Sequence, residues 1–416
     1  MAKERMQSQS YLNGILCMVM TFLFSLILYA PVPLVTSMVD LSGFTLGQAG
    51  TLYSAILLVA GIFVFLGSRV IDKIGAKWTA VSALGMSAIG GLIAFVAGDS
   101  YAIHFVARVI LGIGWGLFFP LPSVIISQWI PQAQQSVWLS LRTVFDFGGG
   151  AAAYVITLHI FTFMHTWQAT LGFYGIVTVL IAVIYMILAR DPQVSDGAVV
   201  SGEGNADASG FKLALRHKAI ILLIITNFTI TLSFQAFCTY EPTYLELYSG
   251  FSTESATNIS SLMTIGSMVA GLISGALVAL LGRSKILGAP MIALQLIGML
   301  IVLFVPNTIA AMVGTFLGGF GACGFYVYWA IVPLELSGGN TSFIAAAAAL
   351  ILAAGWIPSY FIPYVFQALL DAGVSMQMGM AVFLIPGVIS LIAVSFIKET
   401  SQKAKKNIEQ SPEAAL

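Results

Sequence analysis

Charge is what this chain has least of. Its 416 residues include 17 Lys and Arg and 17 Asp and Glu, which is 8% of the total. About a quarter of the residues of an ordinary soluble domain are charged, so this chain cannot surround a folded core with a water-facing surface. The formal net charge of zero argues against a nucleic-acid partner and against a basic protein of the membrane surface.

Reactive side chains are also few, and they form no recognisable catalytic or metal-binding motif. Cys17, Cys238 and Cys323 each lie in an apolar stretch without a CxxC spacing, so we interpret them as small packing residues. The sequence has no HExxH, no phosphate-binding GxxxxGK[ST] and no plausible Ser-His-Asp arrangement. We therefore expect no catalytic residue, no metal, no cofactor and no ATP hydrolysis. The chain is not predicted to be an enzyme.

Apolar residues, in contrast, make up 59% of the chain, and the mean hydropathy is +0.97. They form stretches of roughly twenty residues, the length that a helix needs to cross about 30 Å of hydrocarbon. The sequence therefore predicts an all-α membrane protein embedded in the lipid bilayer. The twelve predicted spans are 12–34, 46–66, 78–97, 102–126, 137–158, 169–188, 219–240, 257–281, 286–305, 308–331, 341–369 and 377–396.

One long polar stretch divides the spans into two sets of six. Residues 191–216 are rich in Gly, Ser, Ala and Asp and poor in large apolar residues, which is typical of a flexible linker. We expect an N-terminal six-helix bundle over 1–190, a C-terminal six-helix bundle over 217–400 and a cytoplasmic tail over 401–416.

The distribution of Lys and Arg predicts the orientation. If the N-terminus is cytoplasmic, fifteen of the seventeen basic residues fall on the cytoplasmic side, and none lies in an external loop. The remaining two, Arg108 and Arg142, lie within spans. We expect a multi-pass protein of the cytoplasmic membrane with both termini in the cytoplasm.

Two loops between spans carry related motifs. The loop after span 2 is "GSRVIDKIGAKW", with Asp72, Lys73 and Gly75, and the loop after span 8 includes "GALVALLGRSK", with Arg283. The first resembles the loop 2–3 signature of the major facilitator superfamily, roughly G-x-x-x-D-[RK]-x-G-[RK]-x-[RK]. The resemblance implies two pseudo-symmetric six-helix bundles and a gating role for these four residues. The alternative is a charged loop that only anchors the topology.

Span 4 carries a second resemblance. The stretch "RVILGIGWGLFFPLP" is similar to span 4 of the organic-anion symporters of the same superfamily, with Arg108, Gly112 and Pro120 at matching positions. This likeness implies that Arg108 binds an anionic substrate. Those symporters usually carry a glutamate where this chain has Trp115, so their protonatable group is missing at this position.

Span 5 contains the unusual stretch "SLRTVFDFGGG". Arg142 and Asp146 are four residues apart, on one face of a helix, inside an apolar span. A charge at the centre of a spanning helix costs about 2.5–3.5 kcal/mol or more and is by default a functional candidate. Arg142 would offer a fork of donors to an anion, while Asp146 would orient that fork or carry a proton. The alternative is a structural ion pair, with Arg142 extending toward the inner interface.

Five further polar or aromatic residues are weaker candidates. Candidates for substrate binding are Gln235 in span 7, Tyr326 and Tyr328 in span 10, and Trp356 in span 11; spans 7 and 10 line the central cavity in the superfamily. Aromatic residues at such positions more often serve packing or the membrane interface than substrate binding. Glu241 is a candidate for proton coupling, with an ordinary carboxylate at the outer interface as its alternative.

Three functional hypotheses follow from this pattern. The first is a secondary transporter that moves a small organic anion by alternating access, either coupled to protons or by anion exchange. The second is a proton-driven efflux antiporter for hydrophobic or drug-like compounds. That class predicts a Gly-Pro motif in span 5, and "FDFGGGAAAY" contains no proline. The third is a non-transporting sensor, in which charges within the spans should be lost. The first hypothesis fits best, with a monomer and a small anionic substrate.

Overall fold

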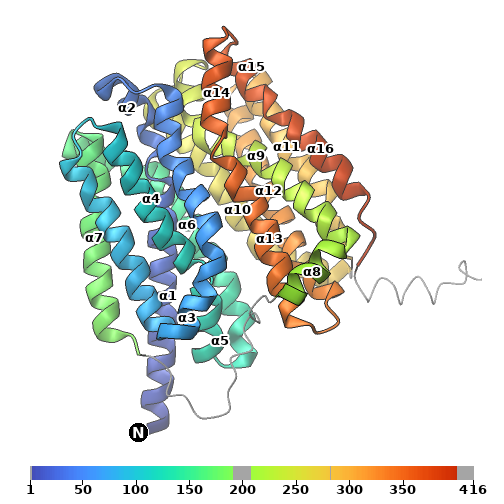
Figure 1. The fold of residues 1–416 in the computed structure, drawn as a ribbon. Coiled ribbons are helices and arrows are strands. Elements are labelled where there is room, and N and C mark those ends of the chain that lie inside the picture. The colour runs from blue at the N-terminus through green and yellow to red at the C-terminus, as the bar shows by residue number, and fades with distance from the viewer. Residues whose placement is uncertain (1, 191–207, 282, 401–416) are drawn as a thin grey trace, which may run out of the picture. The chain divides into compact units, whose positions relative to one another are not determined.

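The computed structural model describes residues 2–190, 208–281 and 283–400, and most of them lie in helices (Figure 1). No strand is found in these ranges, so the all-α prediction is confirmed. The helices are α1 (Ala2–Tyr29), α2 (Val35–Ser42), α3 (Leu46–Val96), α4 (Tyr101–Phe118), α5 (Leu121–Trp129), α6 (Gln132–Met164), α7 (Trp167–Leu188), α8 (Ala208–Arg216), α9 (Lys218–Leu247), α10 (Thr253–Leu281), α11 (Ala289–Phe304), α12 (Thr308–Leu336), α13 (Thr341–Ser359), α14 (Ile362–Asp371), α15 (Met376–Val382) and α16 (Leu384–Ser395), with short 3-10 turns η1 (Val32–Leu34) and η2 (Ser284–Leu287).

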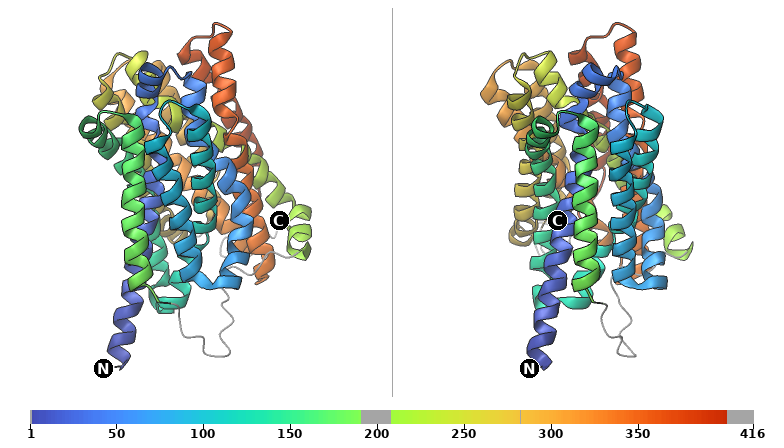
Figure 2. Two further views of the ribbon diagram at one scale, coloured as in Figure 1. Left: turned by 60° about the vertical axis from the view of Figure 1, so that its left-hand side comes forward. Right: turned by 90° about the vertical axis from the view of Figure 1, so that its left-hand side faces the viewer.

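Eleven helical stretches in the described ranges are long and apolar enough to cross a membrane. One of them, α3, has 51 residues. A straight helix of that length would extend about 77 Å, more than twice the thickness of the hydrocarbon core. Its helical geometry breaks at Gly75, where φ is 81° and ψ is 164°, and the chain folds back on itself there (Figures 1 and 2). Thus α3 contains two of the predicted spans, 46–66 and 78–97.

The last residues of the predicted linker are helical. Residues 208–216 form α8, whereas residues 191–207 lie outside the described ranges, as does the predicted tail over 401–416. One side of α8 is buried: Ala214 is inaccessible to solvent, and Gly210 packs against Ser342 of α13. The Gly- and Ser-rich composition of residues 191–210 concealed the amphipathic pattern of "FKLALR".

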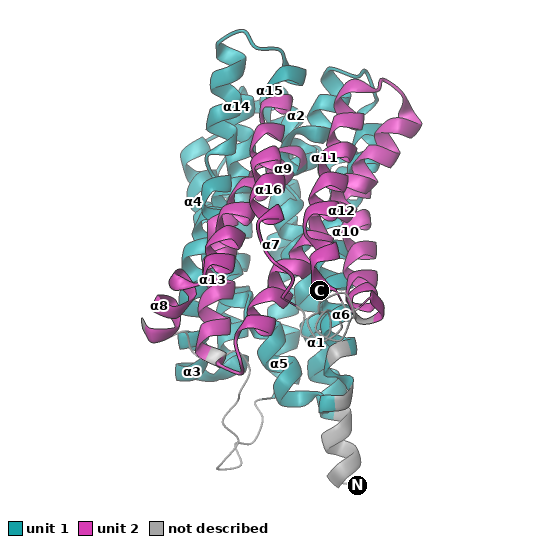
Figure 3. Cartoon of the chain, turned by 90° about the vertical axis from the view of Figure 1, so that its right-hand side faces the viewer, with its two compact units in different colours: residues 1–202, 238–261, 356–379 teal, residues 203–237, 262–355, 380–416 magenta. Residues whose placement is uncertain are grey.

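The chain divides into two compact units, and most of the first is N-terminal (Figure 3). It comprises residues 1–202, 238–261 and 356–379. Within it, α3 packs against α4 and α7, and α1 packs against α6. The contact between α3 and α7 is close, since a Cβ on Gly91 would lie 2.6 Å from the Cα of Gly175. Small residues let the helix backbones approach this closely.

The second unit comprises residues 203–237, 262–355 and 380–416. Its helix α11 packs against α12 and α16. Here too glycines form the contact, because a Cβ on Gly314 would lie 2.6 Å from the carbonyl oxygen of Gly298. The unit boundaries fall inside α9, α10, α13 and α15. The proposed division into bundles 1–190 and 217–400 stays a prediction.

Candidate functional site

Arg142 lies on α6 among apolar and aromatic groups. Its guanidinium carbon is 5.2 Å from the centroid of the Phe119 ring, a distance typical of a cation–π contact. The residue is half-buried, and its Nε atom is buried without a hydrogen-bond partner in the described part of the chain. The side chain is thus positioned by an aromatic ring, while a donor stays available.

Phe119 belongs to a cluster of three rings, which we call the aromatic cluster: Trp115, Phe119 and Trp356. The ring centroids are 5.5 Å apart for Trp115 and Phe119, 4.9 Å for Phe119 and Trp356, and 4.7 Å for the two tryptophans. Trp115 and Phe119 are one helical turn apart at α4, whereas Trp356 comes from α13. The Nε1 of Trp115 is buried without a partner, so the cluster contains a second available donor.

Asp146 lies one turn after Arg142 on α6 and is also half-buried. The hydroxyl of Ser25 on α1 is close to its carboxyl group. Among the described residues no ion pair joins Asp146 to Arg142, although the carboxyl is near enough for the guanidinium to influence it electrostatically. The geometry therefore differs from the direct ion pair considered as an alternative from the sequence.

Glu241 lies on α9 and is inaccessible to solvent, unlike an ordinary interface carboxylate. It is near Tyr154 and Cys238. Pro242 lacks the N–H that would bond to the carbonyl of Cys238, one turn earlier. The hydroxyl of Tyr154 donates to that carbonyl instead, at 3.0 Å. Tyr154 on α6 thus supplies the hydrogen bond that the carbonyl of Cys238 lacks because of Pro242.

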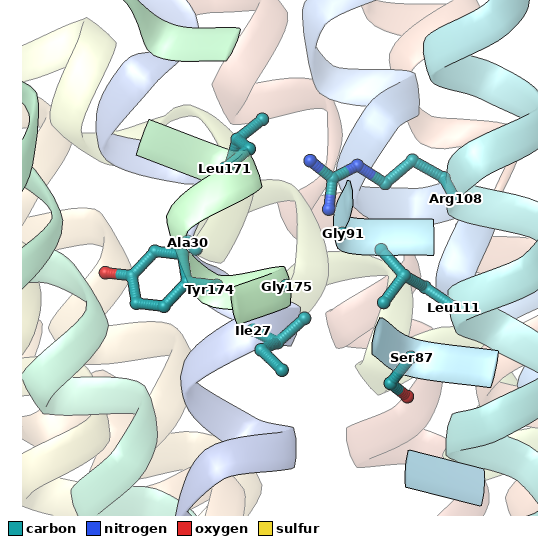
Figure 4. A pocket seen from close by; sticks show the side chains of 9 residues that line it. All are labelled: Ile27, Ala30, Ser87, Gly91, Arg108, Leu111, Leu171, Tyr174 and Gly175. Carbon is teal, nitrogen blue, oxygen red and sulfur yellow. The ribbon is translucent and has the colours of Figure 1, made fainter. Parts of the chain in front are cut away.

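Arg108 lies in different surroundings. It is 3% exposed on α4, and it makes no hydrogen bond or ion pair with any described residue. Figure 4 shows its guanidinium pointing toward Gly91 and Leu171, into a small cavity lined by α1, α3, α4 and α7. No residue of the aromatic cluster lines this cavity, and neither does Arg142. The structure therefore does not bring the two predicted anion-binding arginines to one cavity.

Three further candidates, Gln235, Tyr326 and Tyr328, belong to the second unit. Gln235 is buried on α9. Tyr328 on α12 is inaccessible to solvent, and its ring lies 3.4 Å from the position that a Cβ on Gly288 would take. Tyr326 is half-buried, and its ring centroid is 4.8 Å from that of Trp329. Because Tyr326 and Tyr328 are two residues apart, they point to different sides of α12.

The candidate gating residues of the first motif surround the turn within α3. Asp72 and Lys73 are exposed just before it, and Gly75 has the positive φ that glycine adopts at little cost. The Thr79 hydroxyl donates to the carbonyl of Gly75 at 2.7 Å, which ties the turn to the helix that follows it.

The second motif is held differently. Arg283 is exposed and precedes η2. The next residue, Ser284, is buried, and its hydroxyl is 2.9 Å from a carboxylate oxygen of Glu335 and 2.8 Å from one of Glu399. Two carboxylates thus anchor this loop, although the motif lacks the acid of the first copy.

Sequence analysis did not assign Trp115, Phe119 or Ser25 to a site. A signal existed for the first two, because large rings one turn apart are unusual in a glycine-rich span. Ser25 had no comparable signal, since one serine in an apolar helix is common. Its proximity to Asp146 depends on how α1 packs against α6.

The sequence model of the Major Facilitator Superfamily matches residues 17–359. The chain is 22% identical over 290 residues to a probable sulfoacetate transporter of Cupriavidus necator, covering 66% of each protein. It is 22% identical to a hexuronate transporter of Bacillus subtilis, covering 56% of this chain and 55% of the relative. The chain thus spans just under two thirds of the length of the first relative and just over half of the length of the second. A nucleoside transporter structure matches with a TM-score of 0.75 at 17% identity, covering 92% of this chain and 99% of that one.

The matched relatives and the matched structure are membrane transporters, and this chain shares the fold of that structure. The chain belongs to the Major Facilitator Superfamily. Eleven helices in its described ranges are long and apolar enough to cross a membrane, so it is a multi-pass membrane protein of this family.

Proposed function

We propose that this protein carries a small organic anion across the cytoplasmic membrane by alternating access, with both termini in the cytoplasm. The environment of Arg142 is the observation that supports this proposal most directly. A cation within a spanning segment is costly, and here no described carboxylate contacts it. A ligand that brings its own negative charge would compensate that cost.

The named relatives support the same class of substrate. Sulfoacetate and hexuronates carry sulfonate or carboxylate groups, which the planar fork of a guanidinium can bind through two hydrogen bonds. Arg142 would bind this group, and the rings of Trp115 and Trp356 would border the rest of the molecule. Gln235, Tyr326 and Tyr328 remain proposed substrate contacts.

Two carboxyl groups are proposed for proton coupling. Asp146 is one turn from Arg142, so its charge would affect how firmly the arginine holds an anion. Glu241 is fully buried beside Tyr154 and would load or release a proton during the transport cycle. If neither titrates during transport, anion exchange is the mechanism that remains.

The two motif loops would control gating. We propose that the turn at Gly75, with Asp72 and Lys73 beside it, keeps the cytoplasmic ends of its two spans in a fixed relation. Arg283 would have the corresponding role before η2.

The test is uptake into proteoliposomes of purified protein, with sulfoacetate, glucuronate, neutral glucose and a lipophilic cation as substrates. We expect saturable uptake of at least one of the two anions and no uptake of glucose or of the cation. Both Arg142→Gln and Arg142→Lys should reduce it about tenfold or more, because neither side chain reproduces the charged fork.

The matched control is Arg190→Gln, which removes an exposed arginine and should transport normally. Uptake of the lipophilic cation alone, unchanged in the Arg142 variants, would contradict the proposal and favour the efflux antiporter.

A further inference from the structure

Glu241 is buried too deeply for water to protonate it directly. Its side chain lies within the first unit and is inaccessible to solvent. The polar side chains of Cys238, which precedes it by three residues on α9, and of Tyr154 on α6 are close to it. Both of these residues are buried as well. In this conformation a proton therefore has to reach Glu241 through polar side chains.

Tyr29 lies between two other buried tyrosines that come from different helices. Its ring centroid is 5.5 Å from that of Tyr53 on α3 and 6.0 Å from that of Tyr154 on α6. The Tyr29 hydroxyl is close to the hydroxyl of Tyr53 and to the thiol of Cys238. Hydroxyl and thiol groups both donate and accept hydrogen bonds, so each can take up one proton while it gives up another.

Ser25 extends this series of polar groups to Asp146. It precedes Tyr29 by four residues on α1, so the two side chains lie on the same face of that helix. The Ser25 hydroxyl is close to the carboxyl of Asp146 on α6, and this carboxyl influences the Tyr29 hydroxyl electrostatically. Asp146 is only half-buried, and Arg142 is the charged group beside it. The series thus begins at a partly exposed carboxyl and ends at a fully buried one.

We propose that Tyr29 relays a proton between Asp146 and Glu241, an inference that rests on the proton coupling proposed above. Protonated Asp146 would give its proton to Tyr29 through the hydroxyl of Ser25. At the same time the Tyr29 hydroxyl would pass its own proton through the thiol of Cys238 to the carboxylate of Glu241. Each hydroxyl or thiol exchanges one proton for another and stays neutral. The net change is deprotonation of Asp146 and protonation of Glu241.

The test follows protonation of Glu241 in the purified full-length protein after a rapid drop in pH, without substrate. The readout is infrared absorption by the C=O bond of the protonated carboxyl group, and Glu241→Gln identifies this band by removing it. Tyr29→Phe keeps the aromatic ring but lacks the hydroxyl, so it should slow the appearance of the band about tenfold or more. Tyr174→Phe is the matched control. Tyr174 is also buried in the first unit, but its hydroxyl shares a hydrogen bond with Thr157, so its loss should leave the rate unchanged.

Ser25→Ala provides a second variant in case Tyr29→Phe does not fold, and it should slow the band to a similar extent. At the lowest pH of the series the band should reach its wild-type amplitude in both variants, because a relay changes the rate of protonation and not the final state. Wild-type rates in both variants would show a different route to Glu241 and overturn the relay. Absence of the band from the wild type at every pH would overturn it too. None of these measurements needs a substrate, so the relay and the proposed transport of an organic anion can fail separately.

Discussion

At the residue scale, the two intramembrane arginines differ in what surrounds them. Arg142 is half-buried over an aromatic ring with a carboxyl one turn away, whereas Arg108 is fully buried beside a water-sized cavity. The sequence assigned both to one substrate. We assign the organic anion to Arg142 because only its surroundings combine open donors with rings that can border a larger molecule.

Asp146→Asn tests whether this carboxyl carries a proton. The asparagine keeps the size of the side chain and one hydrogen-bond-accepting oxygen but cannot titrate. We expect accumulation driven by a pH gradient to fall about tenfold or more, while exchange of labelled for unlabelled anion continues, because exchange does not need the proton step. The measurement compares both assays in the same proteoliposomes.

The double variant Arg142→Gln with Asp146→Asn is the control for this prediction. If the two residues only neutralised each other, removing both charges would restore transport that either single change abolishes. We expect no restoration, since the structure shows no ion pair between them.

At the scale of the elements, glycines decide how closely neighbouring helices pack. Gly91 and Gly85 lie on the same helix, α3, but in different environments. A Cβ on Gly91 would meet the Gly175 backbone at 2.6 Å, whereas a Cβ on Gly85 would meet nothing within 4 Å. Alanine substitutions at these two positions therefore distinguish the effect of intrinsic helix propensity from the effect of helix packing.

Gly91→Ala should lower the stability by about 1–3 kcal/mol, because the added methyl forces α3 and α7 apart. Gly85→Ala should be neutral or stabilising by up to about 1 kcal/mol, since alanine is the better helix former. Thermal unfolding of both variants in the same detergent checks this. Equal effects of the two substitutions would show that α3 and α7 do not pack as described.

At the scale of the whole molecule, cysteine labelling tests the predicted orientation in the membrane. Single cysteines at Ser201 in the linker and at Ser252 between α9 and α10 should be labelled from opposite sides by a membrane-impermeant maleimide. We expect Ser201→Cys to be protected in intact cells and Ser252→Cys to react.

The wild type is the natural control for this labelling. Its three cysteines are buried and should react little. Labelling of Ser201→Cys in intact cells would reverse the predicted topology.

The sequence by itself determined the class of protein and the positions of its spans. Long apolar stretches and rare charges are local properties, and an apolar stretch of about twenty residues crosses lipid as a helix, which satisfies all of its backbone hydrogen bonds internally. Even the break in α3 was foreseeable, since Gly75 lies in a polar loop motif. The end of the linker was not, because the composition of residues 191–207 obscured the short amphipathic pattern of α8.

Only the tertiary structure decided which polar residues share an environment. Trp356 joins Trp115 and Phe119 across more than two hundred residues of sequence, and Tyr154 reaches the carbonyl left open by Pro242 on a distant helix. It also separated Arg108 from Arg142, although both lie in apolar spans of one bundle. Helical periodicity gives the face on which a side chain lies. The group opposite that face depends on how distant helices pack, which no local pattern encodes.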